Sequence, residues 1–223
     1  MPRQPRQNPR RRAGPEPFGA PLSALVTAIV AGICIAIVLA AGVLIQVFTV
    51  PRPSGTFADC RTSARLAPGL YAAPPRMCID PHREVDATIQ TTQGNLGLVL
   101  QTKQAPRTVN NFVVLALNGY YDGQRFFGAQ SWEISAGDPK GPGYSLPAAP
   151  IPKGESWQPG SLGMARLPDG RVSGSEFFIT RSGWQGGNPT VPYNHFATVT
   201  TGFDNVAKLS GSDRILQITI KSG

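Results

Sequence analysis

The stretch GSLGMARLPDGRVSGSEFFIT, residues 160–180, shows the pattern that decides the fold class. Glycine and proline break it into short pieces, and EFFITRS (176–182) has the composition of a short strand. HFATVTTG (195–202) and RILQITIKS (214–222) repeat this arrangement, and a brief helix is expected at FDNVAKL (203–209). The C-terminal half is therefore predicted to consist mostly of short strands joined by turns.

The region before it predicts a hairpin and one longer helix. In ATIQTTQGNLGLVLQ (87–101), apolar leucines alternate with other residues beyond a turn at Gln93-Gly94-Asn95, which is typical of a hairpin. Pro106 suits the first turn of a helix that stops at Gly119. The apolar face of this helix is expected to carry Val109, Phe112, Val113, Ala116 and Leu117. One or two helices among many short strands favour a mainly β closed barrel or sandwich over a parallel α/β sheet.

The N-terminal segment is predicted to cross a membrane. Residues 1–17 hold five arginines and one glutamate, so they carry +4 of the formal net charge of +8, and residues 18–50 are uncharged. The apolar run 22–48 can span about 30 Å of hydrocarbon, and it exceeds the apolar core of about 7–15 residues in a cleaved signal peptide. Because basic flanks stay inside, we expect a disordered cytoplasmic tail (1–21), a single transmembrane helix (22–48) in the cell membrane, and an extracytoplasmic remainder.

Two cysteines fall in the segment between this span and the predicted domain at 86–223. Residues 49–85 are rich in proline, alanine and arginine and are expected to form an extracytoplasmic linker. An oxidising compartment permits a disulfide between Cys60 and Cys78, which would contribute roughly 3 kcal/mol, while two free thiols are the alternative. Cys34 is expected to be inert inside the membrane span.

Several other classes of function have little support in the sequence. The basic charge forms no stripe with interleaved aromatic residues, so no nucleic-acid partner is expected. The chain has only two histidines and no CxxC pair, so no metal is expected. GRVSG (170–174) is not a hydrolase nucleophile elbow, and GPGYSL (141–146) lacks the lysine of a phosphate-binding loop.

A set of sequence blocks in fixed order resembles the cyclophilin-type peptidyl-prolyl isomerases. The blocks are GNLGLVL (94–100), APRTVNNF (105–112), YYDG (120–123), FF…GDP (126–139), GSLGMAR (160–166), SGSEFFIT (173–180) and PYNHFATV (192–199). The resemblance covers about residues 86–221, and LGMAR with SEFFIT is the most specific pair. It implies an eight-stranded antiparallel barrel capped by two helices, here preceded by one transmembrane helix, and it implies no cofactor.

The resemblance also implies which residues form the site. The residues placed around a pocket for the proline ring and the adjoining substrate backbone are Phe127, Trp132, Ser135, Ala165, Glu176, Phe178, Val191 and Tyr193. The family's arginine, which donates to the prolyl nitrogen, falls on Gly128. Arg125, through a shift of register, and Arg166, from the opposite wall, are the two candidates to supply that donor instead.

The implied activity is rotation about X–Pro bonds in exported polypeptides. The barrier is about 18–20 kcal/mol, and uncatalysed exchange takes tens to hundreds of seconds. A donor aimed at the prolyl nitrogen accelerates exchange because it binds the twisted amide better than either planar form. With that arginine replaced, the sequence leaves open a weak isomerase and a non-catalytic module that binds Pro-containing segments or a membrane partner. A purely structural envelope protein is a more remote reading.

Overall fold

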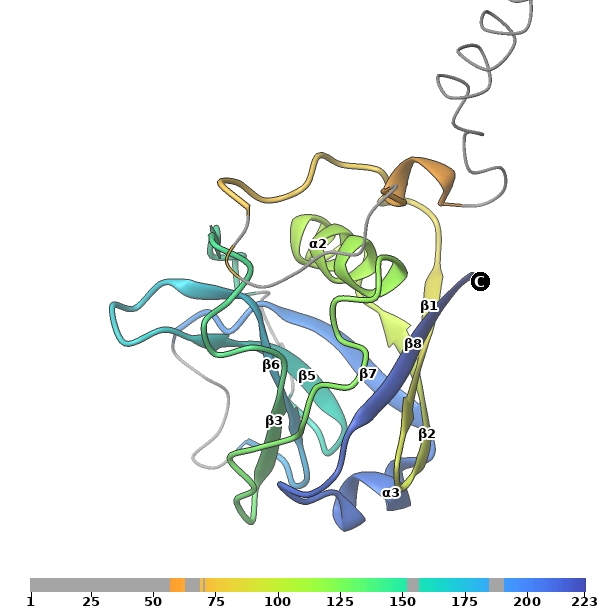
Figure 1. Ribbon diagram of the computed structural model, residues 1–223, viewed down its shortest axis with the longest axis vertical. Coiled ribbons are helices and arrows are strands. Elements are labelled where there is room, and N and C mark those ends of the chain that lie inside the picture. Colours follow the sequence, from red (N-terminus) through yellow and green to blue (C-terminus); the bar gives the residue numbers. More distant parts are fainter. Residues whose placement is uncertain (1–56, 63–68, 70, 152–156, 185–190) are drawn as a thin grey trace, which may run out of the picture. The chain divides into compact units, whose positions relative to one another are not determined.

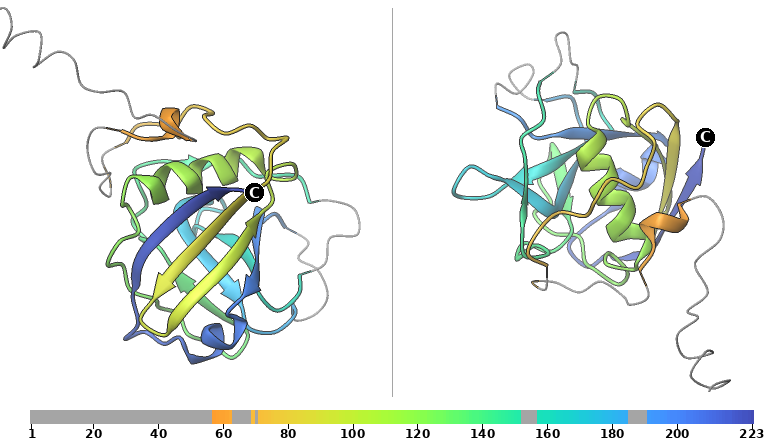
Figure 2. Two further views of the ribbon diagram at one scale, coloured as in Figure 1. Left: turned by 90° about the vertical axis from the view of Figure 1, so that its right-hand side faces the viewer. Right: turned by 90° about the horizontal axis from the view of Figure 1, so that it is seen from above.

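The computed structural model describes residues 57–62, 69, 71–151, 157–184 and 191–223. Within these residues one antiparallel sheet curls around a core, and a helix lies at each end of it (Figures 1 and 2). The elements are η1 (Ala58–Cys60), β1 (Val85–Thr91), β2 (Gly94–Leu100), α2 (Pro106–Leu117), β3 (Glu133–Ala136), β4 (Ser145–Leu146), β5 (Ser161–Arg166), β6 (Val172–Thr180), β7 (His195–Thr201), α3 (Phe203–Lys208) and β8 (Ile215–Ser222).

The sheet is a curled half-barrel of eight strands, which confirms the predicted mainly β antiparallel architecture. Its strands follow the order β3-β6-β5-β7-β2-β1-β8, with β4 paired to β6 off this path. The segment that would close the ring makes only two isolated bridges, Arg125 with Arg214 and Phe127 with Ser135. Gly123 and Gly128, both at positive φ, bound this segment.

The core lies between α2 and the concave face of the sheet. Phe112 on α2 packs 5.1 Å from Phe196 and 5.9 Å from Phe177, measured between ring centroids. Inward residues alternate with outward ones along β6, so Phe177 and Ile179 are fully buried. This alternation directs the intervening side chains, including Phe178, to the outer face of the sheet.

The described part of the predicted linker packs on α2 (Figure 2); we call residues 57–62, 69 and 71–84 the strap. The predicted disulfide between Cys60 and Cys78 is present. Asn110 accepts hydrogen bonds from the backbone N–H groups of Cys78 (2.8 Å) and Ile79 (3.3 Å). Asn118 donates to the Cys60 carbonyl at 2.8 Å. The strap therefore belongs to the same compact unit as the sheet.

The predicted tail (1–21) and transmembrane span (22–48) lie outside the described residues. Among the helices that the structure does describe, none has the length and apolar character needed to span a bilayer.

Candidate active site

The outer face of β3 and β6 gathers most of the residues that the sequence predicted for the site. Ser135 pairs with Phe178 across the ladder, and Phe127 bridges to Ser135. Directly paired residues in antiparallel strands place their side chains on the same face. Glu176 lies on that face too, because it is two residues before Phe178 on β6.

Phe178 is the centre of an aromatic cluster on this face. Its ring centroid is 6.1 Å from that of Trp132, 5.6 Å from that of Tyr193 and 6.1 Å from that of Trp184. Trp157 stacks on it at 5.6 Å with an interplanar angle of 16°. Phe178 is in consequence only 4% exposed. A proline ring has to displace one of these neighbours before it can contact the face of Phe178.

Gly128 stands beside a carboxyl group and a hydroxyl group. A Cβ placed on Gly128 would lie 3.7 Å from Ser135 Cβ and 3.8 Å from Glu133 Oε1. Ser135 donates a hydrogen bond to Glu133 Oε2 at 3.1 Å. The side chain expected here from the family resemblance is a cation, whereas the space next to Gly128 is bordered by an acid.

Two carboxyl groups at this site are harder to ionise than usual. Burial raises the pKa of Glu133, the charge of Glu176 raises it further, and the Ser135 hydrogen bond and Arg181 lower it. Burial also raises the pKa of Glu176, together with the charge of Asp138. Arg181 donates to the carbonyls of Gln130 and Leu209.

The two candidate arginines differ in their placement. The backbone of Arg125 is bridged to Arg214 beside β8, so Arg125 precedes the part of the segment that meets β3. Arg166 Nη1 donates to the Pro192 carbonyl at 3.2 Å, next to Tyr193 of the aromatic cluster. Of the two arginines, Arg166 is therefore the one that contacts a neighbour of the aromatic cluster. Its role as hydrogen-bond donor to the prolyl nitrogen stays a prediction.

The other predicted residues lie at the edge of the cluster. Ala165 is half-buried at the irregularity of β5 between Met164 and Arg166. Val191 is exposed and lines a narrow pocket together with Tyr193.

The sequence reasoning missed Trp157 and Trp184. Trp157 precedes β5 and Trp184 follows β6, both in segments without a periodic apolar pattern. No pattern therefore indicated that their rings reach Phe178. The one available signal was the rarity of tryptophan, since the chain has three and all three meet in this cluster.

Comparisons with known proteins agree with this fold. The model of the family described as cyclophilin type peptidyl-prolyl cis-trans isomerase/CLD matches residues 86–222. A putative bifunctional phosphatase/peptidyl-prolyl cis-trans isomerase of Streptococcus pyogenes is 34% identical over 130 residues, which are 53% of this chain and 26% of the relative. A peptidyl-prolyl cis-trans isomerase of Helicobacter pylori is 35% identical over 100 residues, 42% of this chain and 60% of the relative.

A solved structure extends the agreement to three dimensions. The crystal structure of a cyclophilin type peptidyl-prolyl cis-trans isomerase from Cryptosporidium parvum superposes with a TM-score of 0.54 at 26% identity. The superposition covers 63% of this chain and 99% of that one. Matched along residues 86–222 and in its curled antiparallel sheet, this chain belongs to the cyclophilin-type peptidyl-prolyl cis-trans isomerase family.

Proposed function

We propose that the protein is a membrane-tethered peptidyl-prolyl isomerase that acts on exported polypeptides, and that its turnover is slow. The observation that carries the proposal is the gathering of Trp132, Phe178 and Tyr193 on one outer face, inside the segment that the family model matches. Aromatic rings provide the apolar surface that a proline ring needs. Slow turnover follows from Gly128, which leaves the prolyl nitrogen without the expected guanidinium donor.

The expected rate deficit has a physical scale. During rotation the amide loses its resonance, and the prolyl nitrogen becomes a hydrogen-bond acceptor. Removal of one preorganised donor from a catalytic site typically lowers the rate by about 10²–10³. Arg166 is the candidate that partly replaces this donor, because its guanidinium is held at the Pro192 carbonyl next to the aromatic cluster.

Two features support the proposed location outside the membrane. Arginines precede a long uncharged run, and short basic flanks remain on the cytoplasmic side. The disulfide between Cys60 and Cys78 is typical of oxidising compartments. Protease added to intact cells should then digest the C-terminal domain, and its full protection would contradict this orientation.

A second function is favoured by Gly128, which carries no cation and lies beside Glu133. Without a donor for the prolyl nitrogen, the site suits a module that holds Pro-containing segments without turning them over. An NMR exchange assay of the full chain on an X–Pro peptide separates the two functions. Exchange at the uncatalysed rate would exclude the isomerase and leave the binding module.

The same assay identifies the donor. If exchange is accelerated, Arg166→Ala is expected to abolish most of the acceleration, whereas Arg125→Ala is expected to leave it intact. Indifference to both substitutions would mean that neither arginine supplies the hydrogen bond.

A further inference from the structure

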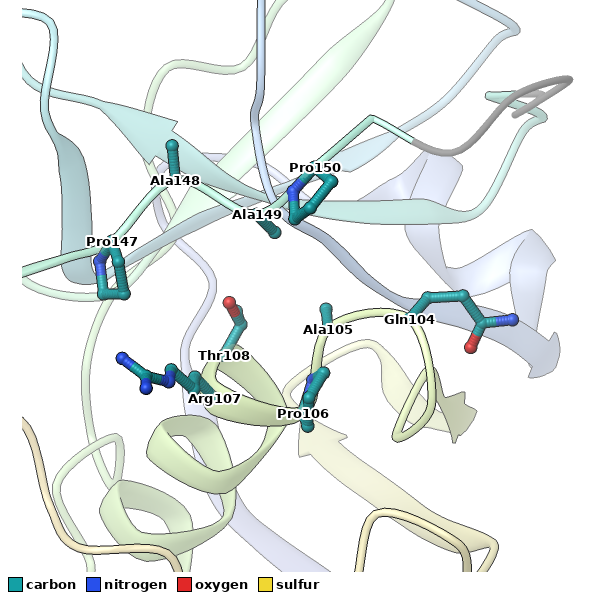
Figure 3. A pocket seen from close by; sticks show the side chains of 9 residues that line it. All are labelled: Gln104, Ala105, Pro106, Arg107, Thr108, Pro147, Ala148, Ala149 and Pro150. Atoms are coloured by element: carbon teal, nitrogen blue, oxygen red, sulfur yellow. The ribbon is translucent and has the colours of Figure 1, made fainter.

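Four pockets adjoin one another between the aromatic cluster and the strap. A narrow neck of about 10 Å³ touches Val191 and Tyr193 at the site. The next pocket, of about 280 Å³, lies between Pro147–Pro150 and the start of α2 (Figure 3). It is followed by pockets of about 290 Å³ and 130 Å³ against the strap. We call this series the groove.

Shared lining residues show that the four pockets form one series. The neck and the first large pocket share Ala105, Ala149 and Pro150 among others. Arg107 and Pro147 line both large pockets. Pro75 of the strap borders the last two.

The groove also concentrates the exposed apolar side chains. Five large hydrophobic residues are exposed in the described part of the chain, and three of them, Met77, Ile151 and Val191, line the groove. The other two, Val99 and Leu216, lie on strands outside it. Exposed apolar side chains that gather in a hollow indicate a surface that binds a partner.

We propose that the groove binds the extended, apolar chain of the client next to its isomerised proline. This inference rests on the proposed function, because the groove begins at Tyr193 of the aromatic cluster. A series of adjoining pockets fits an extended polypeptide that places successive side chains in the three larger ones. The strap then has a binding role, since Pro74, Pro75 and Met77 form one wall.

Charge narrows the class of client segment further. Among the described lining residues, Arg107 is the one that carries a full charge, and it is exposed at the junction of the two large pockets. The uncapped N-terminus of α2 lies beside it and adds a partial positive charge. Segments with apolar or acidic side chains at this junction should bind better than segments with lysine or arginine there.

The test compares a short and a long peptide with the same X–Pro centre. The short one has about four residues and spans roughly 14 Å; the long one has about twelve residues with apolar flanks on both sides and spans roughly 40 Å. The full chain in lipid nanodiscs is assayed for isomerisation by NMR exchange, and binding of the labelled long peptide is followed by fluorescence anisotropy. Met77→Glu introduces a charge into the groove. Leu216→Glu is the matched control, because Leu216 on β8 is about as exposed as Met77 and lies outside the groove.

Met77→Glu is expected to weaken binding of the long peptide about fivefold, as expected for losing burial of the exposed half of one methionine. The kcat/KM for the long peptide should fall by the same factor, while the short peptide and the Leu216→Glu protein remain unchanged. Undiminished binding of the long peptide, or an equal loss for both peptides, would overturn the proposal. So would a Met77→Glu protein that loses self-association in sedimentation while its peptide affinity stays the same.

Failure of the proposed function is distinguishable from failure of the groove. If neither peptide is isomerised above the uncatalysed rate, the isomerase is excluded, and the anisotropy measurement alone decides whether the groove binds the long peptide.

Discussion

Placing an arginine at position 128 should accelerate catalysis. In Gly128→Arg the new Cβ would meet its nearest neighbours at 3.7–3.8 Å, which is ordinary contact distance, so the side chain fits. The backbone at φ +61 is strained for any side chain and should lower the stability by about 1–2 kcal/mol. Against this, a guanidinium that reaches the prolyl nitrogen should raise kcat/KM by up to about 10²–10³.

The matched control is Gly128→Met, which carries the same backbone strain without a donor. Both proteins are compared by NMR exchange on one X–Pro peptide after circular dichroism confirms that they are folded. Because Glu133 Oε1 lies close to the new side chain, it could hold the guanidinium in an ion pair. Gly128→Arg combined with Glu133→Gln removes that competitor. If the double variant is no faster than Gly128→Met, the assignment of position 128 as the donor position is refuted.

Three further predictions concern stability. Cys60→Ser should lower the free energy of unfolding, measured in urea, by roughly 3 kcal/mol. Reduction of the disulfide in the unmodified protein should lower it by the same amount. An unchanged free energy of unfolding would mean that the disulfide does not constrain the unfolded chain. The pKa of Glu133 is raised in the folded protein, so the stabilisation from its protonated form is present below pH 4.5 and is lost as the pH rises through the folded-state pKa. Glu133→Gln should therefore be more stable than the parent protein at pH 7 and equal to it at pH 4. Hydrogen bonds from Thr92, Ser210 and Gln93 lower the pKa of Asp213 to about 2. Asp213→Asn should therefore lower the free energy of unfolding by about 1–3 kcal/mol at pH 7 and by little near pH 2. A loss of stability that does not depend on pH would contradict this.

Local patterns in the sequence were enough for most of the sheet and both helices. The hairpin was predicted with its turn at Gln93–Asn95, and the structure has a loop at Thr92 and Gln93 with Gly94 already paired in β2. The apolar face of α2 was predicted. The burial of Asn110 on α2 and of Asn118 just after it was not, because their partners are backbone groups of the distant strap. Polar residues in a helix acquire buried partners only when the tertiary fold supplies them.

The site residues were predicted from the family resemblance, and the pairing of strands explains where several of them lie. Ser135, Glu176 and Phe178 lie on one outer face because β3 and β6 pair in register. Trp157 and Trp184 reach the same face from segments outside the strands, and no periodic signal encodes that approach. The segment between β3 and β8 links them through two isolated bridges rather than a full ladder.

The disulfide in the strap also sets how the domain responds to a pull from its N-terminal side. Tension entering at Cys60 passes through the sulfur bridge to Cys78 and bypasses the chain between the two cysteines. The load then arrives at β1, which is hydrogen-bonded to β2 on one side and to β8 on the other. A strand that is pulled along its axis between two neighbours must break the hydrogen bonds of both ladders at the same time. A domain built this way therefore resists unfolding by force better than one in which the hydrogen bonds break one after another.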